Sequence, residues 1–167
     1  MTNDIRPVIN LDDVELRDNA HGEAFAARIG SFAGRIGMTG MGAMLHVVAP
    51  GKRAFPFHAH HMTQELFIIL EGEGTYRFGD KEYPIRANDV LAAPNGGAEV
   101  AHQIVNTGTA PLKYLGISAN SVGGDVVEYP DSGKFAVSSR FDWSTMSGGV
   151  RYVGRQESSL DYWDGEE

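Results

Sequence analysis

The sequence predicts a single all-β domain, and three observations predict it. Turn-forming Gly, Pro, Asn and Asp residues recur about every eight to twelve residues, which is the spacing of turns in a β-sandwich or barrel. The apolar runs between these turns are short, and several are rich in β-branched or aromatic residues. The chain has 167 residues, of which 42% are hydrophobic, and this size and composition suit one globular domain with its own core.

The expected elements are short strands separated by turns. The run at 65–70 is apolar on both faces, so we expect it to be buried on both sides. The Gly-Asp pair at 79–80 favours a hairpin. The strands are expected at 43–48, 65–70, 75–78, 81–85, 89–93, 101–106 and 112–117. One segment, Gly22–Ile29, is a short helical candidate, and the glycines of Gly34–Gly42 indicate a loop.

Charge and cysteine content exclude several classes of function. The chain has 14 Lys and Arg against 22 Asp and Glu, and this net charge of −8 argues against nucleic acid or an anionic membrane as the main partner. Cysteine is absent, which excludes disulfides, thiolate metal ligands and a cysteine nucleophile. The first residues do not resemble a signal peptide, and no apolar run is long enough for a membrane span. We therefore expect a cytoplasmic protein.

Histidines and one glutamate form the candidate chemical site. His58 and His60 are two residues apart, so on an extended backbone their side chains project to the same face. A turn at 61–64 would bring Glu65 back beside both imidazoles. His102 lies in another expected strand and joins them if the strands close up. A His-x-His pair alone is more often part of a surface loop than a ligand pair, so the prediction depends on all four residues.

Three neutral imidazoles and one carboxylate suit a transition metal ion. Such a donor set leaves two octahedral positions open for water, substrate or dioxygen, and it fits Mn, Fe, Co, Ni, or Zn with expanded coordination. An ion that prefers oxygen alone, such as Ca, would not select three imidazoles.

The same residues carry a resemblance to a known family. Residues 51–72 read G-x6-H-x-H-x4-E-x6-G, and residues 88–106 read N-x5-P-x-G-x5-H-x3-N. These stretches resemble the two motifs of the cupin superfamily, G-x5-H-x-H-x3,4-E-x6-G and G-x5-P-x-G-x2-H-x3-N, in the same order. This chain has one extra residue before its first motif histidine and three extra before its last. Asn88 replaces the first glycine of the second motif, and Asn also tolerates a left-handed turn.

The resemblance implies the site and its metal. It assigns His58, His60, Glu65 and His102 as ligands of one divalent transition metal ion, Mn, Fe, Ni, Co or Zn, at the open mouth of a small β-barrel. The closing residues 162–166 also resemble the C-terminus of small single-domain bacterial cupins, most of them uncharacterised.

The implied fold is a double-stranded β-helix, or jelly-roll barrel, with arms at both ends. Residues 1–42 are expected to form an N-terminal arm, and residues 43–120 the barrel core. Residues 121–167 are expected to form C-terminal strands and an arm packed on the barrel or on a partner. The sheet edges and the two-sided apolar run favour a homodimer.

Other polar residues near the motifs have weaker functional interpretations. His61 follows His60 directly and should face the opposite way. His46 lies in an expected strand, where packing is a more common role than lining a pocket. Lys52, Arg53 and Arg77 could meet an anionic substrate, although such residues are usually only solvated.

Three functions fit this site. The first is a metal-dependent enzyme of sugar-phosphate isomerase type, in which Lys52, Arg53 or Arg77 would hold the phosphate. The second is an Fe(II)-type dioxygenase acting on a small aromatic or organic-acid substrate. The third is a non-enzymatic module that binds a small molecule or a metal. All three take a small-molecule ligand or substrate, and neither a fold nor a metal fixes the reaction.

Overall fold

The computed structural model describes residues 5–119, 123–140 and 147–166. Within these residues the chain is built from β-strands and short 3-10 turns, and it contains no α-helix. The strands are β1 (Arg17–His21), β2 (Phe25–Ser31), β3 (Met41–Val48), β4 (Ala59–His60), β5 (Glu65–Glu71), β6 (Glu73–Phe78), β7 (Lys81–Arg86), β8 (Val90–Ala93), β9 (His102–Val105), β10 (Leu112–Ala119), β11 (Asp125–Tyr129), β12 (Lys134–Ser139) and β13 (Val150–Gly154). The 3-10 turns are η1 (Leu11–Asp13), η2 (Gly34–Ile36), η3 (Ala98–Val100), η4 (Pro130–Ser132) and η5 (Gln156–Ser158). The expected all-β class is confirmed.

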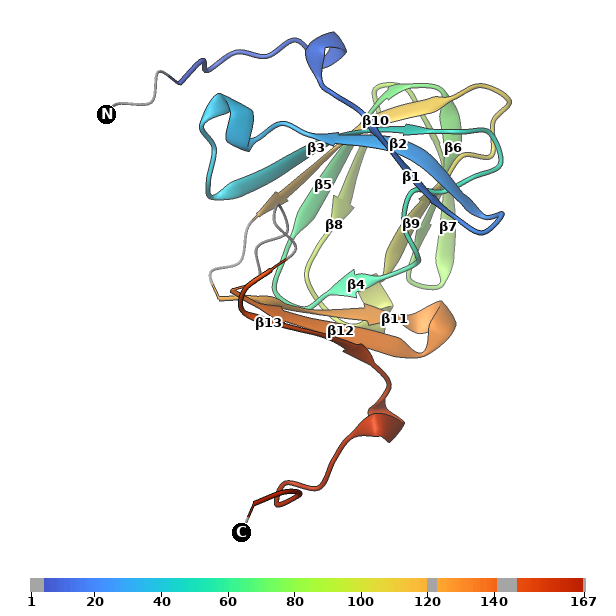
Figure 1. The fold of residues 1–167 in the computed structure, drawn as a ribbon. Helices are drawn as coiled ribbons and strands as arrows, with labels where there is room; N and C mark the ends of the chain where they lie inside the picture. The colour runs from blue at the N-terminus through green and yellow to red at the C-terminus, as the bar shows by residue number, and fades with distance from the viewer. Residues whose placement is uncertain (1–4, 120–122, 141–146, 167) are drawn as a thin grey trace.

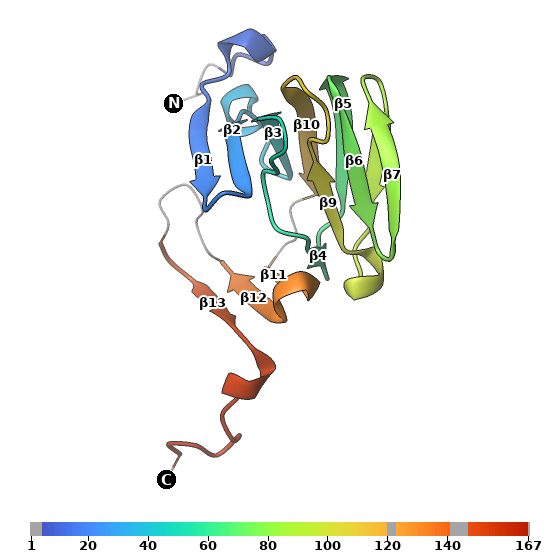
Figure 2. The ribbon, with the colours of Figure 1, turned by 90° about the vertical axis from the view of Figure 1, so that its right-hand side faces the viewer.

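The strands form three sheets (Figures 1 and 2). The six-stranded sheet has the order β1-β2-β3-β10-β5-β8, the three-stranded sheet β7-β6-β9, and the four-stranded sheet β13-β12-β11-β4. The predicted hairpin is present, because β6 and β7 pair antiparallel around Gly79, which has a φ of 57°. Positive φ is readily adopted only by glycine and a few polar residues, which explains the glycine at this turn.

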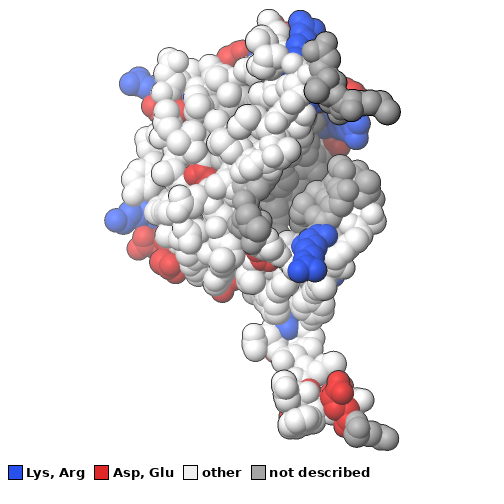
Figure 3. Space-filling model, turned by 90° about the vertical axis from the view of Figure 1, so that its left-hand side faces the viewer, with Lys and Arg blue, Asp and Glu red and all other residues white. Residues whose placement is uncertain are grey.

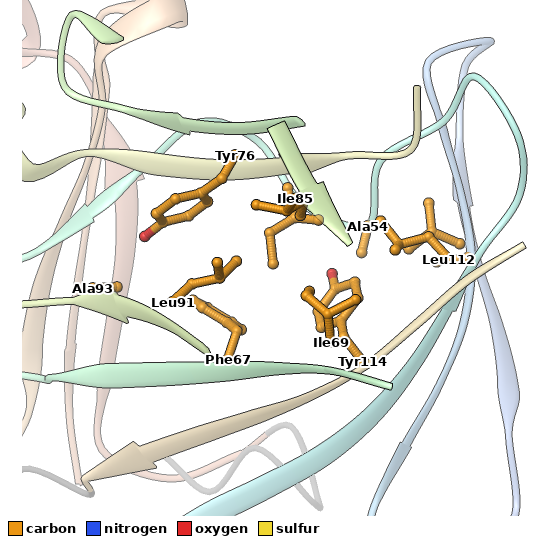
Figure 4. Packing of buried hydrophobic residues seen from close by; sticks show 12 residues of the cluster. Ala54, Phe67, Ile69, Tyr76, Ile85, Leu91, Ala93, Leu112 and Tyr114 are labelled. Carbon is orange, nitrogen blue, oxygen red and sulfur yellow. The ribbon is translucent and has the colours of Figure 1, made fainter. Parts of the chain in front are cut away.

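The main core lies between the six-stranded and three-stranded sheets. Figure 4 shows Tyr76 and Ile85 pointing toward Phe67, Ile69 and Leu91. A second cluster, on the other face of the six-stranded sheet, is built around Val14, Phe32 and Leu45. Partly buried side chains from β5 and β10 pack against this second cluster, and they include Leu70 and Leu115.

The two-sided burial predicted for β5 holds only in part. Phe67 and Ile69 are buried in the main core, and Leu70 packs on the second cluster. Leu66, on the same face as Leu70, remains 38% exposed. The N-terminal residues therefore cover one end of this face and leave the other end open.

The helix predicted at Gly22–Ile29 is wrong. Gly22 lies in a turn, and Phe25 begins strand β2, which pairs with β1 and β3. The helical pattern was short, and pairing on both edges outweighs such a weak local preference. The glycine-rich segment 34–42 is mostly loop, as expected, with η2 at its start and the first residues of β3 at its end.

The two ends of the chain differ in their contacts. Residues 17–31 extend the six-stranded sheet by two strands. The segment after β13 projects away from the sheets in Figures 1 and 2, and its Leu160, Tyr162 and Trp163 side chains are exposed. Docking of this arm stays a prediction. Within the described residues, no helix has the length and apolar character that crossing a membrane requires.

Candidate metal centre

Backbone pairing brings the two motif segments together. The backbone N–H of His58 donates to the carbonyl of His102 at 3.1 Å, and the N–H of His102 donates back to His58 at 2.7 Å. His60 lies in β4, which pairs with β11 through Val127. Residues far apart in sequence are therefore fixed next to one another by main-chain hydrogen bonds rather than by the side chains of the site.

The side chains of the four sequence-predicted residues converge on one carboxylate oxygen. Glu65 Oε2 lies 3.1 Å from Nε2 of His102. The same oxygen lies 3.5 Å from Nε2 of His60 and 3.9 Å from Nε2 of His58. His58, His60 and Glu65 each place a ligand atom within 4.8 Å of the others, a spacing that one metal ion could bridge. His102 joins this group through Glu65.

The tautomers of two histidines are set by their neighbours. Nδ1 of His58 lies 2.8 Å from the carbonyl oxygen of Pro56, and a carbonyl can only accept, so this nitrogen carries the proton. Nδ1 of His60 lies 2.7 Å from Oδ2 of Asp125 and donates to that carboxylate. With each proton held on Nδ1, the Nε2 lone pair is left to face the centre, as in metal-ligating histidines.

His102 differs from the other two imidazoles. It is buried, and its Nδ1 has no hydrogen-bond partner among the described residues. Its Nε2 is within hydrogen-bond distance of Glu65. Its ring lies against Phe67 and Tyr76, which belong to the main core. His102 is thus positioned by packing and by its backbone, without a polar partner on the far nitrogen.

The charges of the site suit metal binding. Burial, together with the electrostatic influence of the neighbouring His102 and His60 imidazoles, lowers the pKa of His58 to about 4, so the His58 imidazole is neutral at neutral pH. Burial would raise the pKa of Glu65, but the hydrogen bond with His102 and the nearby imidazoles outweigh it and lower the pKa, which keeps the carboxylate charged. Burial would lower the pKa of His60, but Asp125 and Glu65 outweigh it and raise the pKa. A cation can replace the proton that His60 attracts.

Asp125 is a site residue that sequence reasoning missed. It begins β11, 65 residues after His60, outside both motifs. Its second oxygen accepts the backbone N–H of Met62 at 2.9 Å. Burial opposes ionisation, but the hydrogen bonds from His60, Thr63 and Met62 lower the pKa of Asp125 to about 2. A lone Asp after a Gly-Gly pair carries no motif, and only the fold shows its role.

The centre opens into a cavity of about 840 Å³. His58, His60 and Glu65 line one part of it, and His46 lines another. The less favoured interpretation of His46, as a pocket residue, is therefore the correct one. Its ring stacks on Tyr114, with ring centres 4.5 Å apart. Figure 3 shows a hollow on the face that it views.

Other sequence-predicted residues lie away from the cavity lining. His61 faces elsewhere and pairs with Glu128 at 3.2 Å, as its position directly after His60 predicted. Arg77 forms a bidentate ion pair with Asp131, at 2.9 and 3.1 Å.

The other two expected anion-binding residues are also outside the lining. Lys52 donates to the backbone carbonyl of Glu23 at 2.5 Å, and the guanidinium of Arg53 lies over the ring of Phe25. Among the described residues that line the cavity, Arg140 is the one with a cationic side chain of Lys or Arg type.

The donor set fits a divalent transition metal ion. Imidazole nitrogens and one carboxylate oxygen are the ligands that Mn, Fe, Co, Ni and Zn accept. Two of the imidazoles have fixed tautomers, and the carboxylate is charged. These features do not select one metal among the five.

Comparisons with known proteins find similarity to one domain family. Residues 44–118 match the family model of the cupin domain. An oxalate-binding protein of Thermotoga maritima is 37% identical over 68 residues, which are 41% of this chain and 54% of that protein. This chain therefore spans about half the length of that relative.

Solved structures share the fold over nearly the whole chain. A sugar phosphate isomerase of the cupin superfamily from Silicibacter pomeroyi has a TM-score of 0.74 at 21% identity, covering 95% of this chain and 98% of that one. A putative sugar phosphate isomerase from Acidithiobacillus ferrooxidans has a TM-score of 0.73 at 23% identity, covering 92% and 95%. At these identities the likeness shows a common fold and leaves the reaction open.

Proposed function

We propose that this chain, a small protein of the cupin superfamily, binds one divalent transition metal ion through His58, His60, Glu65 and His102. The observation that carries this proposal is the convergence of three imidazole Nε2 atoms on one oxygen of Glu65. In this proposal the three sheets form a jelly-roll barrel with the ligands at its open mouth. The role of His102 as the fourth ligand is part of the proposal.

The chain's own residues prepare the site. Pro56 and Asp125 hold the protons of His58 and His60 on Nδ1 and keep both Nε2 atoms directed inward. Nε2 of His102 lies 3.1 Å from Oε2 of Glu65, a separation that two ligands of one ion can have. When bound, a metal ion of this type supplies Lewis acidity toward two adjacent oxygens of a substrate.

We propose an isomerase-type reaction as the first candidate. It moves a proton between neighbouring carbons of a substrate that carries two adjacent oxygens. Support comes from the two isomerase structures, which cover 92% and 95% of this chain rather than the cupin domain alone. A phosphate or carboxylate on such a substrate would meet Arg140, because Lys52, Arg53 and Arg77 lie outside the cavity lining. The test is turnover of a panel of aldose and ketose phosphates, with Arg140→Gln expected to raise KM.

Binding of oxalate or a similar small dicarboxylate is the second candidate. It is favoured by the 37% identity to an oxalate-binding protein over 68 residues. Oxalate offers two adjacent oxygens, as the first candidate also requires. Stabilisation by oxalate without turnover of any panel member supports binding alone. The dioxygenase alternative uses the same ligands, and oxygen uptake with added Fe(II) tests it.

Metal analysis of protein purified without a His tag tests the metal proposal. Wild-type protein should retain close to one transition metal ion per chain, and His58→Ala should lose it. His61→Ala is the matched control, since His61 adjoins the site in sequence but pairs with Glu128. Equal retention by wild type and His58→Ala would contradict the proposal. The homodimer and the cytoplasmic location stay predictions.

A further inference from the structure

Three large apolar side chains are exposed where the cavity opens. Met38 is 44% exposed, Met41 41% and Phe55 37%, and all three line the same cavity as the candidate ligands. Apolar surface gathered in a concave site stabilises whatever apolar group covers it, since each buried methylene contributes favourable free energy. We call this group of Met38, Met41 and Phe55 the apolar wall.

The floor of the cavity connects the metal centre to the strand that carries Met41. On the six-stranded sheet, Glu65 of β5 pairs with Ser118 of β10, which pairs with Gly42 of β3. Two of these three positions have small side chains. The row spans two strand spacings, or about 10 Å, and its small side chains rise little above the sheet.

The neighbouring row has the same form. Phe67 of β5 pairs with Gly116 of β10, which pairs with Met44 of β3. A Cβ on Gly116 would lie 2.9 Å from Cε1 of His46 and 3.3 Å from Cε1 of Phe67, so a glycine is needed for these two rings to lie beside it. Small residues on β10 therefore keep a trough open from the ligand strand β5 to strand β3.

A substrate held only at the metal centre would leave the apolar wall in water. Oxalate, for example, has no apolar group to place on it. Methionine side chains adapt to varied shapes. The apolar wall therefore suits an alkyl or aryl group better than a group with several polar atoms. The trough leads directly from Glu65, so the same molecule can reach both ends.

We infer that the ligand of this protein is an organic acid with two parts, an oxygen-chelating head at the candidate metal centre and an apolar body lying along the trough against Met38, Met41 and Phe55. The inference rests on the proposed function for the head group. It adds the apolar body, which neither the isomerase structures nor the oxalate-binding relative suggests.

Calorimetry with straight-chain 2-oxo acids tests the inference. Protein loaded with Ni²⁺ is titrated with pyruvate and with each longer homologue up to 2-oxooctanoate. Affinity should rise about two- to four-fold for each added methylene, because each one leaves water for the apolar wall. Met41→Ser and Phe55→Ser should flatten this rise while leaving pyruvate affinity unchanged. Val90→Ser, at an exposed apolar position outside the cavity lining, should keep the wild-type rise.

The outcomes separate the two proposals. Pyruvate binding with equal affinity for every chain length overturns the apolar body and leaves the metal-bound head intact. A rise with chain length that is unchanged when Ni²⁺ is removed supports the apolar body and contradicts the chelated head. Flat affinities together with a change from dimer to monomer in Met41→Ser, measured by sedimentation, would make the wall a contact between two copies and overturn the inference.

Discussion

Residues 58–65 and strand β11 meet at the same site but contribute to it differently. The first segment carries His58, His60 and Glu65, whose spacing follows a local motif. Strand β11 carries no proposed ligand, yet its Asp125 fixes the proton of His60 from 65 residues away. Ligand identity is thus encoded locally, whereas ligand orientation depends on how distant strands pair.

Removing a proposed ligand should have the largest effect. We expect Glu65→Ala to weaken metal binding by more than about 100-fold, because the loss of a direct ligand should exceed the 10- to 100-fold typical of an orienting partner. Competition against a chromogenic chelator measures the change. Glu71→Ala, at the other end of β5, is the control and should bind as wild type does. Wild-type affinity in Glu65→Ala would remove the carboxylate from the centre.

Removing the orienting group should have the next largest effect. Asp125→Asn keeps the shape of the side chain but loses the charge that holds the proton on His60, so we expect affinity to fall about 10- to 100-fold. Glu128→Gln changes another carboxylate on the same strand, one that pairs with His61 instead. If both variants weaken metal binding equally, a general effect of strand β11 is responsible, and Asp125 has no specific role in orienting His60.

The third prediction concerns the pH dependence of stability through His46. Burial lowers its pKa to about 4, against an ordinary value of 6.5. The unfolded chain therefore takes up a proton at higher pH than the folded chain, and stability is lost as pH falls from about 6.5 toward 4. This single shift corresponds to about 2 kcal/mol between pH 7 and pH 5.

Urea unfolding of metal-free protein at the two pH values measures this loss. His46→Gln removes the titrating group, so its free energy of unfolding should fall less over the same interval, by about the amount assigned to His46. A variant that loses as much stability as wild type would show that His46 is not buried in neutral form.

The smallest effect is expected away from the cavity. Asp131→Asn breaks the ion pair with Arg77, in which the Asp131 side chain is half exposed. Such a pair contributes less than about 1 kcal/mol, so the free energy of unfolding should fall by no more than that. Metal affinity should stay at the wild-type value. A loss of metal affinity would mean that this part of the four-stranded sheet also positions the ligands.

Much of the fold and the proposed ligands could be predicted from sequence because the signals are local. The two-residue spacing of His58 and His60 fixes a shared face, and Gly79 marks its hairpin. Gly22–Ile29 was wrongly predicted as a helix, because its pairing on both edges depends on distant strands.

Features set by tertiary structure could not be predicted. The role of Asp125 follows from the pairing of β4 with β11. Lys52 and Arg53 were candidates for anion binding, but only the folded chain shows that they face away from the cavity lining. The apolar wall brings Phe55 together with Met38 and Met41 of an earlier segment, and no periodicity in the sequence links the two segments.

X-ray absorption spectroscopy of the Ni²⁺-loaded protein tests the central claim most directly. Imidazole rings give characteristic outer-shell scattering, so the number of histidines around the metal can be fitted. We expect three imidazoles and one carboxylate in wild type, and two imidazoles in His102→Ala. A spectrum fitted by oxygen donors alone, or one unchanged in His102→Ala, would contradict the account.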